Sequence, residues 1–152
     1  MKFARFLIAA CMIAGLSSVA AAAEDGLIRK QSANGVYQTI DKLKAALESK
    51  GLTIFADIDH SAGAKRAELA LRPTRLLIFG NPKLGTPLMQ AAATTAIDLP
   101  QKAVAYRDDD GKVWLVYNDP MYLKQRHAIE GRDEVLKKIA GALDNFTDAA
   151  IK

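Results

Sequence analysis

Cysteine is almost missing from this sequence: of 152 residues only Cys11 is a cysteine, and it lies within the first 23 residues. The rest of the chain therefore has no disulfide, no thiol nucleophile, no cysteine ligand for a metal and no attachment point for covalent haem. Long apolar runs are also missing after residue 23, where no stretch approaches the roughly 20 residues that a membrane-spanning helix needs. We therefore expect no transmembrane segment in that part of the chain.

Complete catalytic motifs are absent as well. The sequence contains no G-x-S-x-G, no glycine-rich phosphate loop and no H-E-x-x-H. The acidic run at residues 108–111 lacks the spacing and the closing glutamate of a calcium-binding loop, and its Asp-Gly step favours a hairpin turn. These absences favour a noncatalytic role.

The first 23 residues have the layout of a secretory signal peptide. Lys2 and Arg5 give a basic start, Phe6–Leu16 is an apolar run, and small residues lead up to Ala23. This order predicts cleavage near Ala23 and a mature protein that is periplasmic or secreted. Acylation of Cys11, as in a lipoprotein, is the alternative, although only about ten residues precede it.

Residues 24–152 have a length that suits one domain with one hydrophobic core. The formal net charge of the whole chain is +4, and it falls to +2 once Lys2 and Arg5 are removed with the leader. Proteins that bind nucleic acid usually concentrate basic residues on one surface. We therefore predict a single domain and no nucleic-acid partner.

Hydrophobic periodicity predicts the order of the elements. Val36, Ile40, Leu43 and Leu47 recur at helical spacing, and Gly51 stands where a helix ends. We expect strands at 26–30, 52–59, 71–79, 102–107 and 112–118, helices over about 34–51 and 120–143 with a break at 131, and shorter helical segments within 61–68 and 84–93. This β-α-β-β-(α)-β-β-α order predicts an α+β fold, a two-layer sandwich of a mainly antiparallel sheet with helices on one face.

The first candidate site is the run Asp57-Ile58-Asp59-His60. Strict alternation would place Asp57 and Asp59 side by side on the face away from the main core, with His60 at the end of the strand. A metal or a general acid-base pair could use these groups. The alternative, which we favour, is a solvated strand edge, because a metal normally needs three or four converging ligands.

His127 is the second candidate and the only other histidine. The order of elements could bring His127 and His60 to one pocket, and noncovalent haem held by His60, His127 or Met121 is a further option. The alternative is that His127 is a surface or packing residue on a helix.

Several short motifs occur in an order that resembles the bacterial domain of unknown function 302 family. They are Ile58-Asp59-His60, Leu71-Arg72-Pro73-Thr74, Phe79-Gly80-Asn81-Pro82, Leu84-Gly85-Thr86-Pro87-Leu88-Met89, Asp98-Leu99-Pro100, Tyr117-Asn118-Asp119-Pro120, Tyr122-Leu123 and Arg126-His127. The resemblance implies an α+β domain that is able to form dimers. It supplies no reaction, but it adds weight to Asp59, His60, Asn81 and His127 as ligand-binding residues. For Asn81 the alternative is a purely local role, because Asn is favoured in turns before proline.

These observations leave three hypotheses for function. The first is an exported, noncatalytic module of the cell envelope that binds a small ligand, haem or metal, or an envelope protein, near Asp59-His60 and Asn81-Pro82. The second is a small hydrolase or isomerase in which His60 or His127 acts as general base, oriented by Asp59. The third is a structural homodimer, which predicts an exposed apolar strip on the sheet. No cofactor is identified by the sequence.

Overall fold

The structure is a computed structural model that describes residues 25–152. The predicted signal peptide at residues 1–23, its cleavage near Ala23 and the alternative at Cys11 all lie outside the described residues. Within residues 25–152, no helix is both long enough and apolar enough to cross a membrane.

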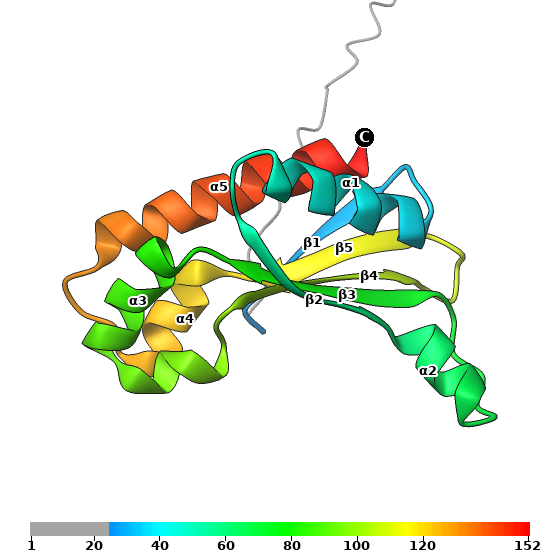
Figure 1. Cartoon of the computed structure of the whole chain (residues 1–152), viewed down its shortest axis with the longest axis horizontal. Helices are drawn as coiled ribbons and strands as arrows, with labels where there is room; N and C mark the ends of the chain where they lie inside the picture. The colour runs from blue at the N-terminus through cyan, green and yellow to red at the C-terminus, as the bar shows by residue number, and fades with distance from the viewer. Residues whose placement is uncertain (1–24) are drawn as a thin grey trace, which may run out of the picture.

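A five-stranded antiparallel sheet forms the centre of the fold (Figure 1). The strands stand in the order β1-β5-β4-β3-β2, so the first two strands of the sequence form the two edges. Their bounds are β1 (Leu27–Ser32), β2 (Thr53–Asp59), β3 (Thr74–Gly80), β4 (Gln101–Arg107) and β5 (Val113–Asn118). Each neighbouring pair is antiparallel, which confirms the predicted α+β class.

Two long helices, α1 (Val36–Glu48) and α5 (Asp133–Ile151), pack against each other and cover one face of the sheet (Figure 1). The shorter helices lie at the ends of the sheet. Helix α2 (His60–Arg66) is at one end, whereas α3 (Pro82–Ala91) and α4 (Pro120–His127) are at the other. The 3-10 helix η1 (Ala93–Ile97) contacts both α3 and α4.

The core lies between the sheet and the two long helices. The four apolar residues at helical spacing in α1 are all at most 2% exposed and pack in one cluster with Leu77 and Phe79 of β3. Helix α5 adds Leu136, Ile139 and Leu143 to the same cluster. Full burial of a side chain of this size contributes about 1.5–3 kcal/mol, so this layer supplies most of the force that holds the helices to the sheet.

The prediction that Asp57 and Asp59 face away from the core is wrong. Strand β2 follows the expected alternation as far as Ile54, which pairs with Phe79, but a bulge then shifts the register before Ala56. The extra residue reverses the faces of the rest of the strand. Asp57 therefore lies opposite buried Leu77, on the side of the sheet that the helices cover.

Candidate functional site

Asp59 and His60 lie at the junction between β2 and α2. Asp59 is the N-cap of α2: its Oδ1 accepts hydrogen bonds from the backbone N–H of Ala62 at 2.9 Å and from the Ser61 hydroxyl at 2.7 Å. The Tyr37 hydroxyl donates to its Oδ2 at 3.1 Å. These donors, the Ala62 N–H first, hold the pKa of Asp59 below its ordinary value. His60 is the exposed first residue of α2. The Asp59 carboxylate therefore stabilises the junction between β2 and α2 through these hydrogen bonds.

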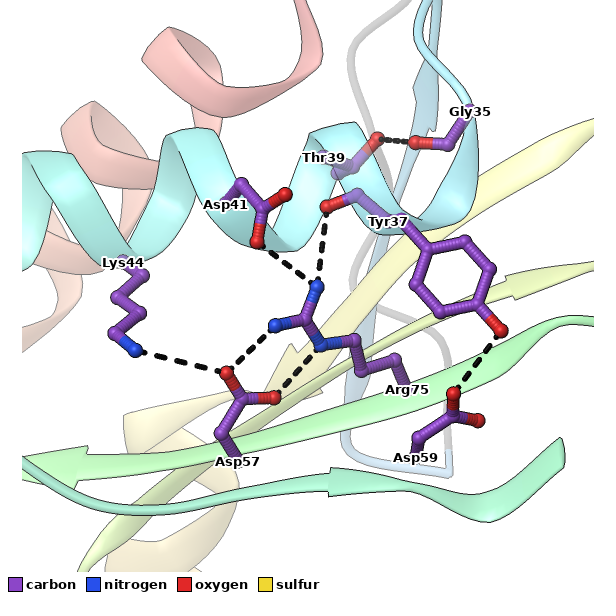
Figure 2. Close-up of polar contacts among 8 residues, drawn as sticks. All are labelled: Gly35, Tyr37, Thr39, Asp41, Lys44, Asp57, Asp59 and Arg75. Atoms are coloured by element: carbon purple, nitrogen blue, oxygen red, sulfur yellow. Dashed lines mark hydrogen bonds and ion pairs between the residues drawn. The ribbon is translucent and has the colours of Figure 1, made fainter. Parts of the chain in front are cut away.

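Asp57 is the centre of an ionic cluster between β2, β3 and α1 (Figure 2). The Arg75 guanidinium donates to both of its oxygens, from Nε and Nη2, at 2.7 Å each. Arg75 Nη1 donates to Asp41 of α1 at 2.9 Å, and its guanidinium lies 5.8 Å from the centre of the Tyr37 ring. The hydrogen bonds from Arg75 lower the pKa of Asp57. This cluster fastens α1 to the edge of the sheet.

The described residues contain no group of three or more His, Cys, Asp or Glu side chains arranged to hold a metal ion. Figure 1 also places α2, which begins at His60, and α4, which ends at His127, at opposite ends of the sheet. The structure therefore does not bring the two histidines together.

His127 makes polar contacts that the sequence did not indicate. Its Nε2 lies 2.6 Å from Asp98 Oδ2 and its Nδ1 lies 3.0 Å from the Thr94 hydroxyl oxygen. The His127 side chain is 5% exposed, and Arg126 lies 3.6 Å from the other oxygen of Asp98. The carboxylate beside this histidine is therefore Asp98, not Asp59. Asp98 could have been suspected only from its place in a motif that carries the family resemblance.

An apolar cavity of about 190 Å³ opens between the ends of β3 and β4, helix α3 and helix α5. Buried Phe79, Ile139 and Leu143 lie among its walls, whereas exposed Phe55 and Pro82 mark its outer part. Its full lining is Leu52, Phe55, Phe79, Gly80, Asn81, Pro82, Leu84, Gly85, Thr86, Met89, Leu99, Pro100, Gln101, Ile139, Ala142, Leu143 and Phe146. None of these side chains is ionisable.

The two amide side chains of the wall, Asn81 and Gln101, differ in their hydrogen bonds. Asn81, one of the predicted site residues, is the N-cap of α3, and its Oδ1 accepts the backbone N–H of Lys83 at 2.9 Å. Gln101, the first residue of β4, is 8% exposed, and its buried Nε2 has no hydrogen-bond partner among the described residues. Sequence reasoning missed Gln101, because nothing in a strand-initial glutamine indicates that it will face a cavity.

Comparison with known proteins places the chain in a family. Residues 28–146 match the family described as "Domain of unknown function DUF302". The chain is also similar to two proteins named "Fluoride-specific ion channel FluC 1", from Brucella suis and Brucella abortus. Each is 48% identical over 106 residues, which are 70% of this chain and 42% and 39% of those proteins. This chain thus spans about two fifths of the length of those relatives.

A solved structure gives the same fold. The uncharacterized conserved DUF302 protein from Bacillus stearothermophilus superposes with a TM-score of 0.73 and 18% sequence identity, over 82% of this chain and 98% of that one. The family match covers most of the chain, and the fold agrees with it. The resemblance noted from the sequence motifs is therefore confirmed, and this chain belongs to the DUF302 family.

Proposed function

We propose that this chain is a noncatalytic binding module of the cell envelope, which holds a small, mainly apolar molecule in the cavity beside α3 and α5. The observation that carries the proposal is the mainly apolar cavity of about 190 Å³, whose lining contains no ionisable side chain and includes buried Phe79, Ile139 and Leu143. A bound apolar molecule would supply the contacts that the walls lack when the cavity is empty. Burial of its apolar surface contributes about 25 cal/mol per Å².

The size of the cavity limits the size of the ligand. An engineered cavity of about 150 Å³ with aliphatic walls binds benzene in another protein. The cavity of about 190 Å³ in this chain therefore suits one ring with short substituents, or a short branched chain. Water alone would occupy it poorly, because an ordered internal water needs about two to four polar partners.

The chemistry of the wall supports binding rather than catalysis at this place. General acid-base and nucleophilic catalysis need a titratable or nucleophilic group within reach of the substrate. The lining offers hydrocarbon, two amides and the exposed Thr86 hydroxyl. His127 and Asp98 are not part of it.

Two observations support a place in the cell envelope. The first 23 residues have the order of a secretory signal peptide. In addition, the Brucella relatives are named as ion channels, which work in membranes, and more than half of their length lies outside the match. We propose that the chain is exported and that it acts as an accessory module beside other envelope components.

Filling the cavity tests the proposal. Gly85 lines it, and a side chain added there would meet Leu99 at ordinary contact distance, whereas Gly141 of α5 has open space around it. We expect Gly85→Leu to weaken binding of cumene, an apolar one-ring probe, at least tenfold in calorimetric titrations. The matched control Gly141→Leu should bind cumene as the wild type does. Equal affinities of the two variants would contradict the proposal.

A second candidate function rests on the Thr94–His127–Asp98 chain of contacts. If the His127 Nε2–H donates to Asp98, Nδ1 is left free to accept the proton of the Thr94 hydroxyl as its oxygen attacks an ester carbonyl. His127 then gives this proton to the alcohol that leaves, and water, deprotonated by the same Nδ1, releases the acid from the Thr94 ester. Both distances lie within the range required for such transfers. This is the hydrolase hypothesis, with Asp98 in the orienting role.

Hydrolysis of p-nitrophenyl acetate tests the second candidate. We expect Thr94→Ala and His127→Gln each to lower the turnover of the wild type at least 100-fold, with Thr53→Ala as the control at an exposed threonine far from the histidine in sequence. Circular dichroism would establish that the variants are folded. A wild-type rate equal to that of buffer would exclude this activity.

A further inference from the structure

We infer that the open face of the sheet, which is the face opposite α1 and α5, is the surface through which two copies of this chain associate about a twofold axis. Six side chains of the three middle strands define the open face: Leu76 and Ile78 of β3, Val104 and Tyr106 of β4, and Trp114 and Val116 of β5. The inference does not depend on the proposed ligand, because none of these six residues lines the cavity.

The middle strands carry apolar side chains on both faces of the sheet. Neighbouring residues of a strand point to opposite faces, and Leu77, Ala105 and Leu115 lie in the core beneath the helices. The residues on either side of these three therefore point away from the helices, and all six are apolar. An antiparallel sheet with one face in water normally alternates apolar and polar residues, whereas near-continuous apolar runs are typical of strands that are buried on both faces. The sequence of these strands therefore suits a second covering layer.

The helices of residues 25–152 are placed elsewhere. Figure 1 shows α1 and α5 on the opposite face and the shorter helices at the two ends of the sheet. Of the six residues of the open face, Val116 is buried and the other five are half-buried. The apolar surface continues onto the edge strand β2, where Ile58 pairs with Leu76 and is 38% exposed. A contiguous apolar surface of this kind marks an interaction site.

The area on this side of the molecule approaches what a stable dimer needs. Five strands of six or seven residues, about 4.8 Å apart and rising about 3.3 Å per residue, give a sheet surface of about 480 Å². Specific interfaces bury about 800 Å² on each partner. Helices α2 and α4 project to the side of the open face at opposite ends of the sheet (Figure 1). Exposed apolar residues there can add to the interface: Leu69 and Leu71 after α2, which are 67% and 49% exposed, and Met121 of α4, which is 43% exposed.

The open face fits a second copy of itself because it is neutral. A twofold axis brings identical surfaces together, so charges of one sign on the face would repel each other. The nearby cations are already engaged within the chain: Arg29 pairs with Asp25, and the Lys102 ammonium donates to two backbone carbonyls. The Trp114 indole N–H donates to Asp108 at 2.7 Å, so its ring can be covered without leaving this donor unpaired. The face therefore suits an identical apolar surface better than a charged partner.

Charges introduced on the open face test the inference. Because β4 is the middle strand, a twofold axis that centres the two faces passes near Val104, and Val104→Lys would bury two unpaired ammonium groups in one interface. We expect the wild type, purified from cells that produce the full sequence, to sediment as a dimer in velocity ultracentrifugation. Val104→Lys should raise the Kd of the dimer at least 100-fold, and Ile58→Lys at least tenfold. The matched control Ala45→Lys, at an exposed position of α1, should leave the Kd unchanged.

Circular dichroism would establish that the variants are folded; if Val104→Lys is not, Ile58→Lys alone decides, because its site on the edge strand is exposed. A wild type that stays monomeric across the concentration series would overturn the inference, and so would a dimer that the folded lysine variants leave intact. A monomer that binds phosphatidylcholine–phosphatidylglycerol vesicles, and loses this binding in Ile58→Lys, would assign the open face to a lipid surface and overturn the inference as well. Cumene binding in the cavity is measured separately, so the proposed function stands or falls on its own test.

Discussion

Among the residues outside the cavity, Arg75 is the one whose substitution should lower the stability of the protein most clearly. Its side chain is 17% exposed and that of its partner Asp57 is 22% exposed, so the two charged groups are partly shielded from water at the edge of the sheet. Substitution by methionine keeps the aliphatic part of the side chain but leaves the Asp57 carboxylate without its two donors. We expect Arg75→Met to lower the free energy of unfolding by about 2 kcal/mol at pH 7, measured by urea denaturation.

The same pair predicts a dependence on pH. Arg75 holds the pKa of Asp57 below its ordinary value of 3.8 in the folded protein. The stabilisation that this ion pair provides is therefore present above about pH 4. It is lost as the pH falls through the lowered pKa that Asp57 has in the folded protein. The variant Arg75→Met should show a shallower loss of stability in this acid range than the wild type does. As a control, Lys137→Met removes an exposed ion pair and should change the stability by less than about 0.5 kcal/mol; a similar loss in both variants would refute the argument.

Candidate residues could be named from the sequence, but their partners could not. Asp57 and Asp59 were assigned to the wrong face because one extra residue in β2 reverses the alternation, and a bulge of this kind leaves no clear mark in the amino-acid pattern. His127 stays a candidate, and the carboxylate beside it lies 29 residues away along the chain. Contacts of this kind depend on how whole elements pack.

Elements were easier to predict because their signals are local. The apolar spacing of α1 and the Asp119-Pro120 start of α4 each indicate the element within a few residues. Asp59, Asn81 and Asp119 all turn out to be N-caps, each accepting a backbone N–H of the helix that follows. For Asn81 this is the local role that was the alternative to ligand binding, and its place in the cavity wall keeps both roles open to test.

Helix α3 allows the two roles of Asn81 to be separated. A serine at an N-cap retains an oxygen acceptor, whereas alanine does not. We expect Asn81→Ala to lower the free energy of unfolding by about 1 kcal/mol and Asn81→Ser to leave it nearly unchanged, measured by urea denaturation. If capping is the main role, Asn81→Ser should also keep the wild-type affinity of the cavity for acetophenone, a one-ring ketone that an amide could contact. An affinity that falls equally in both variants would instead indicate that the amide contacts the ligand.

At the scale of the whole molecule, the cavity is the feature that sequence patterns could not reveal. Its walls come from β2, β3, α3, β4 and α5, which are spread over residues 52–146. Strands β2, β3 and β4 are neighbours both in the sequence and in the sheet, and the wall is completed when α3 and α5 pack beside them. Hydrophobic periodicity predicted the layers of this α+β fold but gave no indication of a space left between them. The homodimer hypothesis stays a prediction.

Export is the prediction that concerns the entire chain. Every residue of the core cluster lies between Val36 and Ala150, so a mature protein that begins at Glu24 contains the complete core. We expect cells that produce the full sequence to yield periplasmic protein whose first residue is Glu24, identified by N-terminal sequencing and intact mass. Cys11→Ser should leave this processing unchanged, whereas lipoprotein maturation would need the cysteine. Because cleavage requires a small residue before the cut, Ala23→Arg should leave the precursor uncut. Full-length protein in the soluble lysate of wild-type cells would contradict export.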